Sequence, residues 1–169
     1  MSLTSSAVRR SGNTVLLAFH FLLIATLCVA LSGCAATTSE ESTMEDTLET
    51  QLADSLDAAS GVYVRTSSSG FANTEVAVRL YLDDVTEPTL SDAVRSAFET
   101  TWHSWTPEPV GISVEVVDGP KPAEPKRVDG SVIDITSAAR ALDVPGDDSY
   151  QIIHFNVQQL TRRFGESGN

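Results

Sequence analysis

The residues whose types could support catalysis or metal binding are few and widely spaced. His103 and His154 lie downstream of the N-terminal apolar segment, and neither has a second ligand at the spacing typical of a zinc site. Ser104 adjoins His103, but neighbouring residues of a helix do not face each other, so we do not expect a nucleophile and its base there. The sequence therefore predicts no catalytic residue, no metal site and no cofactor.

Two other groups of side chains are candidates for binding a partner protein. Trp102 lies at the edge of an apolar helical face that Trp105 continues, so it is either a partly covered core residue or an interface anchor. Lys121, Lys126 and Arg127 form a basic cluster in a segment with three prolines in six residues. Because prolines favour extended backbone, this segment is either a solvent-exposed connector or a docking strand for an acidic partner.

The N-terminus has the order of a secretory signal peptide. Arg9 and Arg10 precede a nearly unbroken apolar run from Val15 to Leu31, and small residues follow. The run of about 17 residues is at the lower limit for crossing a bilayer. An uncleaved transmembrane helix is therefore the alternative interpretation.

Leu31-Ser32-Gly33-Cys34 resembles the lipobox of bacterial lipoproteins. The resemblance implies that a signal peptidase recognises Leu31, Ser32 and Gly33, removes residues 1–33 and leaves a diacylglyceryl group on Cys34. Two acyl chains anchor a protein stably, whereas one chain binds reversibly, so the protein is expected on the extracytoplasmic face of the cell membrane. Residues 34–42 are small and polar, and we expect them to form a flexible tether.

The charge balance excludes some classes of partner. The chain of 169 residues has 11 basic and 23 acidic residues, and only two basic residues lie in the predicted signal peptide. The mature part therefore carries 9 basic and 23 acidic residues, a net charge of −14. Such acidity argues against nucleic-acid binding and against broad adhesion to anionic lipid. With Cys34 lipidated, no cysteine remains for a disulfide or a thiolate metal site.

Periodicity predicts the elements that position these residues. Residues 43–118 are expected to fold as helix–strand–strand–helix–strand, with a capping box at Ser42–Glu45 before the first helix. The two strands of the hairpin are indicated by alternation, first at Val62 and Val64, which alternate with Arg65, and then at Val76, Val78 and Leu80. An apolar stripe from Leu90 to Trp105 predicts the second helix. A connector follows at 119–130, and 131–165 extend the same domain. This extension is expected to contain a short strand at 132–135, a helix through Thr136, a strand at 150–155 and a helix capped by Asn156. The predicted fold class is α+β, a two-layer sandwich of ferredoxin-like or BON-like αββαβ type with a C-terminal strand–helix extension.

This element order in a lipoprotein is similar to that of the BON domain, a module of envelope proteins associated with phospholipid binding. Gly70 corresponds to its hairpin glycine, and Val110-Gly111 reverses its Gly-Val pair. The interpretation that we favour is a membrane-anchored, non-enzymatic binding or accessory protein of the cell envelope. A BON-type lipid-binding module and a small extracytoplasmic enzyme are the alternatives.

Overall fold

A computed structural model describes residues 36–68, 73–128, 130–145 and 149–168 of the chain. The chain divides into two compact units, Met1–Glu40 and Glu41–Asn169. The predicted signal peptide, its recognition residues and Cys34 lie outside the described residues. Among the helices that the structure describes, none is long and apolar enough to span a membrane.

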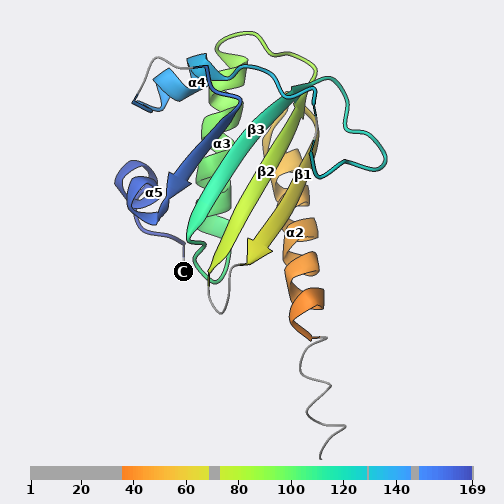
Figure 1. Ribbon diagram of the computed structural model, residues 1–169, viewed down its shortest axis with the longest axis vertical. Helices are drawn as coiled ribbons and strands as arrows, with labels where there is room; N and C mark the ends of the chain where they lie inside the picture. The colour runs from red at the N-terminus through yellow and green to blue at the C-terminus, as the bar shows by residue number, and fades with distance from the viewer. Residues whose placement is uncertain (1–35, 69–72, 129, 146–148, 169) are drawn as a thin grey trace, which may run out of the picture. The chain divides into compact units, whose positions relative to one another are not determined.

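A four-stranded mixed sheet forms the centre of the second unit. Its strands are β1 (Ala59–Ser68), β2 (Thr74–Leu82), β3 (Gly111–Asp118) and β4 (Ile152–Asn156), in the order β1-β2-β3-β4 (Figure 1). The β1–β2 and β3–β4 pairs are antiparallel, whereas β2 and β3 are parallel. A parallel pair needs a long crossover, and α3 (Thr89–Ser104) supplies it.

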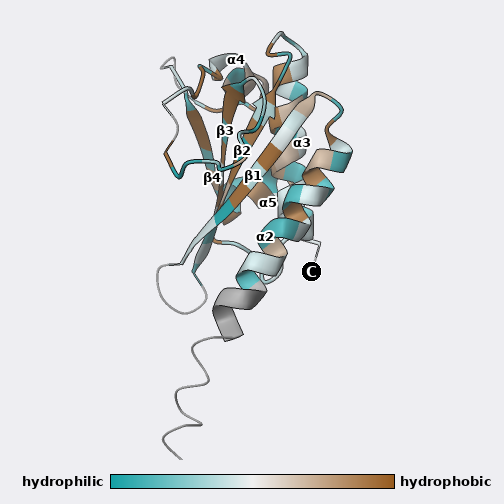
Figure 2. Ribbon diagram, turned by 90° about the vertical axis from the view of Figure 1, so that its right-hand side faces the viewer, coloured by the Kyte–Doolittle hydropathy of each residue, from teal (hydrophilic) through white to brown (hydrophobic). Residues whose placement is uncertain are grey.

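Helices cover one face of this sheet. They are α2 (Ala36–Ser55), of which residues from Glu41 onward belong to this unit, α3 and α5 (Val157–Phe164), and the short α4 (Thr136–Ala141) packs on α3 (Figures 1 and 2). The strand residues facing the helices are buried apolar side chains: Val62, Val64, Val76, Val78, Leu80, Leu82, Ile112, Val114, Val116, Ile153 and Phe155. Each such side chain stabilises the fold by about 1.5–3 kcal/mol through its removal from water. The predicted α+β two-layer sandwich with a C-terminal strand and helix is confirmed.

The first helix begins earlier than predicted. It starts at Ala36, so residues 36–42, expected to be a tether, are helical, and Ser42 lies inside the helix instead of capping it. The segment contains no glycine or proline that would interrupt a helix. Glu45, expected in the capping box, instead accepts hydrogen bonds from the backbone N and Oγ1 of Thr66, both at 2.6 Å.

Two carboxylates of α2 thereby accept hydrogen bonds from backbone N–H groups at the outer edge of β1. Glu49 Oε1 accepts from the backbone N of Val64 at 2.8 Å, next to the Glu45–Thr66 bonds. An uncovered edge strand offers unpaired N–H groups to other chains, so these contacts protect β1 from unwanted strand pairing.

The C-terminal extension agrees with its prediction except at one strand. Residues around Val132 form a single bridge to Val117 and not a strand. The last helix begins as expected, because Asn156 and Gln159 make a reciprocal capping box. Gly165 ends this helix with a positive φ of 82°.

Candidate functional site

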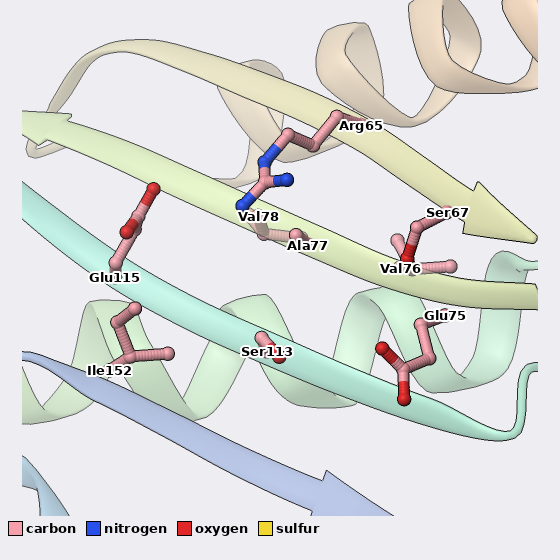
Figure 3. Close-up of a pocket in the computed structure, with 9 residues that line it drawn as sticks. All are labelled: Arg65, Ser67, Glu75, Val76, Ala77, Val78, Ser113, Glu115 and Ile152. Atoms are coloured by element: carbon pink, nitrogen blue, oxygen red, sulfur yellow. The ribbon is translucent and has the colours of Figure 1, made fainter. Parts of the chain in front are cut away.

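The face of the sheet that the helices leave uncovered carries the candidate site. Because side chains alternate along a strand, this outer face bears the polar residues of each strand. The connector lies over one end, the covered end, defined by Arg79, Glu115 and Lys121. The other end has no such cover. A shallow cavity of about 130 Å³ runs from Ser67 and Glu75 at that end, past Arg65 and Ser113, to Glu115 and Ile152 beside the covered end (Figure 3).

A buried ion pair fastens the connector to the covered end. Arg79 on β2 and Glu115 on β3 are directly opposite in the parallel register, with Nε and Nη2 of Arg79 at 2.7 and 2.6 Å from Glu115 Oε1. Arg79 also donates to the backbone oxygens of Lys126, at 2.6 Å, and Arg127, at 3.3 Å. Burial alone would lower the pKa of Arg79, but the nearby Tyr81 hydroxyl and the Glu115 carboxylate outweigh this and raise the pKa. Arg79 therefore stays charged.

Lys121 closes the connector over the edge of the sheet. Its Nζ bonds Glu49 Oε2 at 2.6 Å and the backbone oxygen of Val62. Its stem packs on Gly61, where an added Cβ would lie 2.5 Å from Lys121 Cβ. The absence of a side chain at Gly61 is thus what allows the connector to approach β1.

A second cavity of about 220 Å³ lies between the sheet and the connector and shares lining residues with the first. Arg65, Glu115 and Ile152 line both cavities, and we call the pair the open trough. Arg127 and Val128 from the connector also line the second cavity, and so does Arg79, so the trough reaches the covered end. Figure 3 shows Arg65 extending from β1 across β2, with Ile152 on the β4 side.

Exposed apolar groups and unpaired cations meet at this trough. Val128 is 81% exposed and Ile152 is 50% exposed. Within the described part of the chain, the guanidinium groups of Arg65 and Arg127 have no acidic partner within salt-bridge distance. The neighbouring Arg79–Glu115 pair neutralises itself. The charged residues that line the two cavities are three arginines (Arg65, Arg79, Arg127) and two glutamates (Glu75, Glu115), which leaves one net positive charge in an acidic protein.

The structure divides the residues singled out in the sequence. Trp102 is fully buried, and its Nε1 donates to the backbone oxygen of Gly165 at 2.9 Å. The interface interpretation of Trp102 is therefore wrong, because the turn after α5 covers the ring. Trp105 is buried as expected, and His103 is exposed.

The basic cluster of the connector separates into two roles. Lys121 is fixed by Glu49, whereas Lys126 and Arg127 use only their backbone oxygens in contacts with the sheet and keep exposed side chains. His154 lies on the outer face, with its Nδ1 3.1 Å from Ser113 Oγ. Of the sequence candidates, only Arg127 lines the open trough.

Sequence reasoning missed Arg65, Val128 and Ile152. The alternation around Val62 and Val64 did place Arg65 opposite the core, which is a usable signal. The strand order and register, which place Arg65 of β1 and Ile152 of β4 in one cavity, gave no signal in the sequence.

No protein-family model, curated protein or solved structure matches this chain.

Proposed function

We propose that this protein is a lipid-anchored, non-enzymatic binding protein of the cell envelope. Its open trough would bind an acidic segment of a partner protein that also carries aliphatic side chains. One observation carries the proposal: the exposed apolar side chains of Val128 and Ile152 flank the same cavity as Arg65 and Arg127, which have no acidic partner in the described ranges of the chain. Large apolar groups left exposed next to each other are typical of interaction sites.

Charge complementarity supports an acidic partner. With Glu75 and the Arg79–Glu115 pair counted, Arg65 and Arg127 leave the trough one net positive charge, although the chain as a whole has a net charge of −12. A carboxylate placed between two guanidinium groups can accept paired hydrogen bonds from each planar fork. The acidic remainder of the surface would repel the same partner, which favours binding at the trough over other positions.

The apolar rim supports a protein segment over a small ion. Covering Ile152 and Val128 removes apolar surface from water, at about 25 cal/mol per Å². Ser67, Ser113 and Glu75 offer hydrogen-bonding groups at the far end of the trough. An extended chain lying along the strands could therefore place apolar side chains at one end and polar groups at the other.

A site-specific photocrosslinker at position 152 tests the proposal. The full-length lipidated protein would carry benzoylphenylalanine in place of Ile152, and a matched protein would carry it in place of Glu99, which is exposed on α3. After irradiation in native membranes, mass spectrometry should find one partner protein joined at position 152 and absent from position 99. Equal crosslinking at both positions, or none at position 152, would contradict the proposed site.

The membrane anchor needs a separate test, because Cys34 lies outside the described residues. We expect the intact mass of the mature protein to show a diacylglyceryl group on Cys34. The substitution Cys34→Ser should remove this mass and prevent cleavage after Gly33. A mature protein that begins at another residue, or that lacks lipid, would contradict the anchored part of the proposal.

A further inference from the structure

A second cationic cavity lies where α3, α5 and the turn after α4 meet, away from the open trough. Its volume is about 380 Å³, and Arg95, Asp143, Arg162 and Arg163 line it. Arg95 comes from α3, Arg162 and Arg163 from the last turn of α5, and Asp143 from the turn after α4. Among the described residues that line this space, three arginines of an acidic chain are thus gathered with a single carboxylate.

Backbone oxygens hold two of these arginines in place. Arg95 Nη2 donates to the oxygen of Ala141 at 3.0 Å, and Arg163 Nη2 donates to the oxygen of Asp143 at 2.8 Å. The Arg163 guanidinium also lies 4.8 Å from the centre of the Phe155 ring. Each guanidinium has five N–H groups, so both keep donors that these contacts do not use.

The positive charge of the cavity is poorly neutralised. The Asp143 carboxylate is 95% exposed, and its Oδ2 is 3.9 Å from Arg163 Nη1. Arg162 is exposed, and its side chain has no hydrogen bond or ion pair among the residues that the structure describes. Arg95 and Arg163 donate to backbone oxygens at the C-terminal end of α4, and these contacts account for their positions. No such contact accounts for the position of Arg162 among the described residues.

We infer that this cavity binds a phosphate-class oxyanion. Planar guanidinium forks match the oxygens of such an anion, and three of them from two helices can surround it. The anion would relieve the mutual repulsion of the arginines. Either a free phosphate or the phosphate of a lipid headgroup carries this chemistry.

Calorimetric titration of the full-length lipidated protein in uncharged detergent micelles tests the inference. Inorganic phosphate and a short-chain phosphatidylglycerol would be titrated separately, and then against each other. We expect saturable binding that Arg162→Gln weakens about tenfold or more, since hydrogen bonds to charged groups are strong. Arg140→Gln is the matched control, because Arg140 is exposed on α4 and does not line the cavity.

The two ligands distinguish the two sources of phosphate. Tighter binding of inorganic phosphate indicates a soluble ligand, and tighter binding of the lipid indicates a headgroup. The inference is overturned if neither ligand saturates, or if Arg162→Gln binds as the unchanged protein does.

Discussion

The two ends of the outer face use similar residues in opposite ways. At the covered end, Arg79 is 2% exposed, is paired with Glu115 and holds the connector through two backbone oxygens. At the open trough, Arg65 and Arg127 have no acidic partner among the described residues and lie beside exposed apolar groups. The polar face of one sheet can therefore stabilise the fold at one end and remain available for binding at the other.

The largest expected effect comes from breaking the covered end. Arg79→Leu leaves Glu115 buried without its partner and removes the donor to Lys126 and Arg127. We expect the free energy of unfolding, measured with urea, to fall by about 3–5 kcal/mol. The double substitution Arg79→Leu with Glu115→Leu should restore at least half of this loss, because no unpaired charge is then buried. A loss below about 1 kcal/mol in the single variant would show that the pair does not secure the connector.

A smaller loss is expected from separating the connector from β1. In Gly61→Ala the new Cβ would lie 2.5 Å from Lys121 Cβ, so backbone must shift. Overpacking of this kind costs about 1–3 kcal/mol, which urea unfolding can measure. Gly130→Ala is the control within the same connector, since a Cβ there meets nothing within 4 Å. Equal losses in the two variants would argue against close packing of Lys121 on Gly61.

Lys121 itself should contribute less, because its ion pair is partly exposed. The side chains of Lys121 and Glu49 are 28% and 22% exposed, and pairs of this kind contribute about 0–1 kcal/mol. Lys121→Met should therefore lower the free energy of unfolding by up to about 1 kcal/mol, which thermal unfolding can detect. Lys126→Met should leave thermal unfolding unchanged, as its side chain is exposed. A greater loss for Lys126→Met would reverse the two roles assigned within the basic cluster.

The weakest change that we expect is a pH dependence of stability at Asp134, which lies just before α4. Hydrogen bonds from the hydroxyl and backbone N–H of Thr136, and from Ser149, lower the pKa of Asp134. Because the folded pKa lies below the unfolded value, this contribution is present above about pH 4 and is lost as pH falls through the folded pKa. Asp134→Asn should lower stability at pH 6 and leave it nearly unchanged at pH 2. An equal loss at both pH values would contradict the carboxylate's role.

Most of the fold followed from the spacing of apolar residues. Alternation at Val76, Val78 and Leu80, and the helical stripe from Leu90 to Trp105, predicted β2 and α3. The start of α2 was missed because polar residues without glycine or proline are equally consistent with a tether and with a helix. Local pattern cannot decide between them.

The candidate site was much less predictable. Arg79 and Glu115 are 36 residues apart, and only the parallel register of β2 and β3 brings them together. Trp102 looked partly exposed because the turn at Gly165 that covers it is distant in the sequence. Arg127 was found because it lies in a basic segment, whereas Ile152 resembles any core residue of a short strand.

Charge reversal at the open trough tests whether an acidic partner binds there. The variant Arg65→Glu with Arg127→Glu would be compared with the unchanged protein by photocrosslinking from position 152, with urea unfolding measured on the same samples. We predict that the partner adduct falls at least about tenfold while the free energy of unfolding changes by less than about 0.5 kcal/mol. An undiminished adduct in the stably folded variant would contradict binding of an acidic partner at the trough.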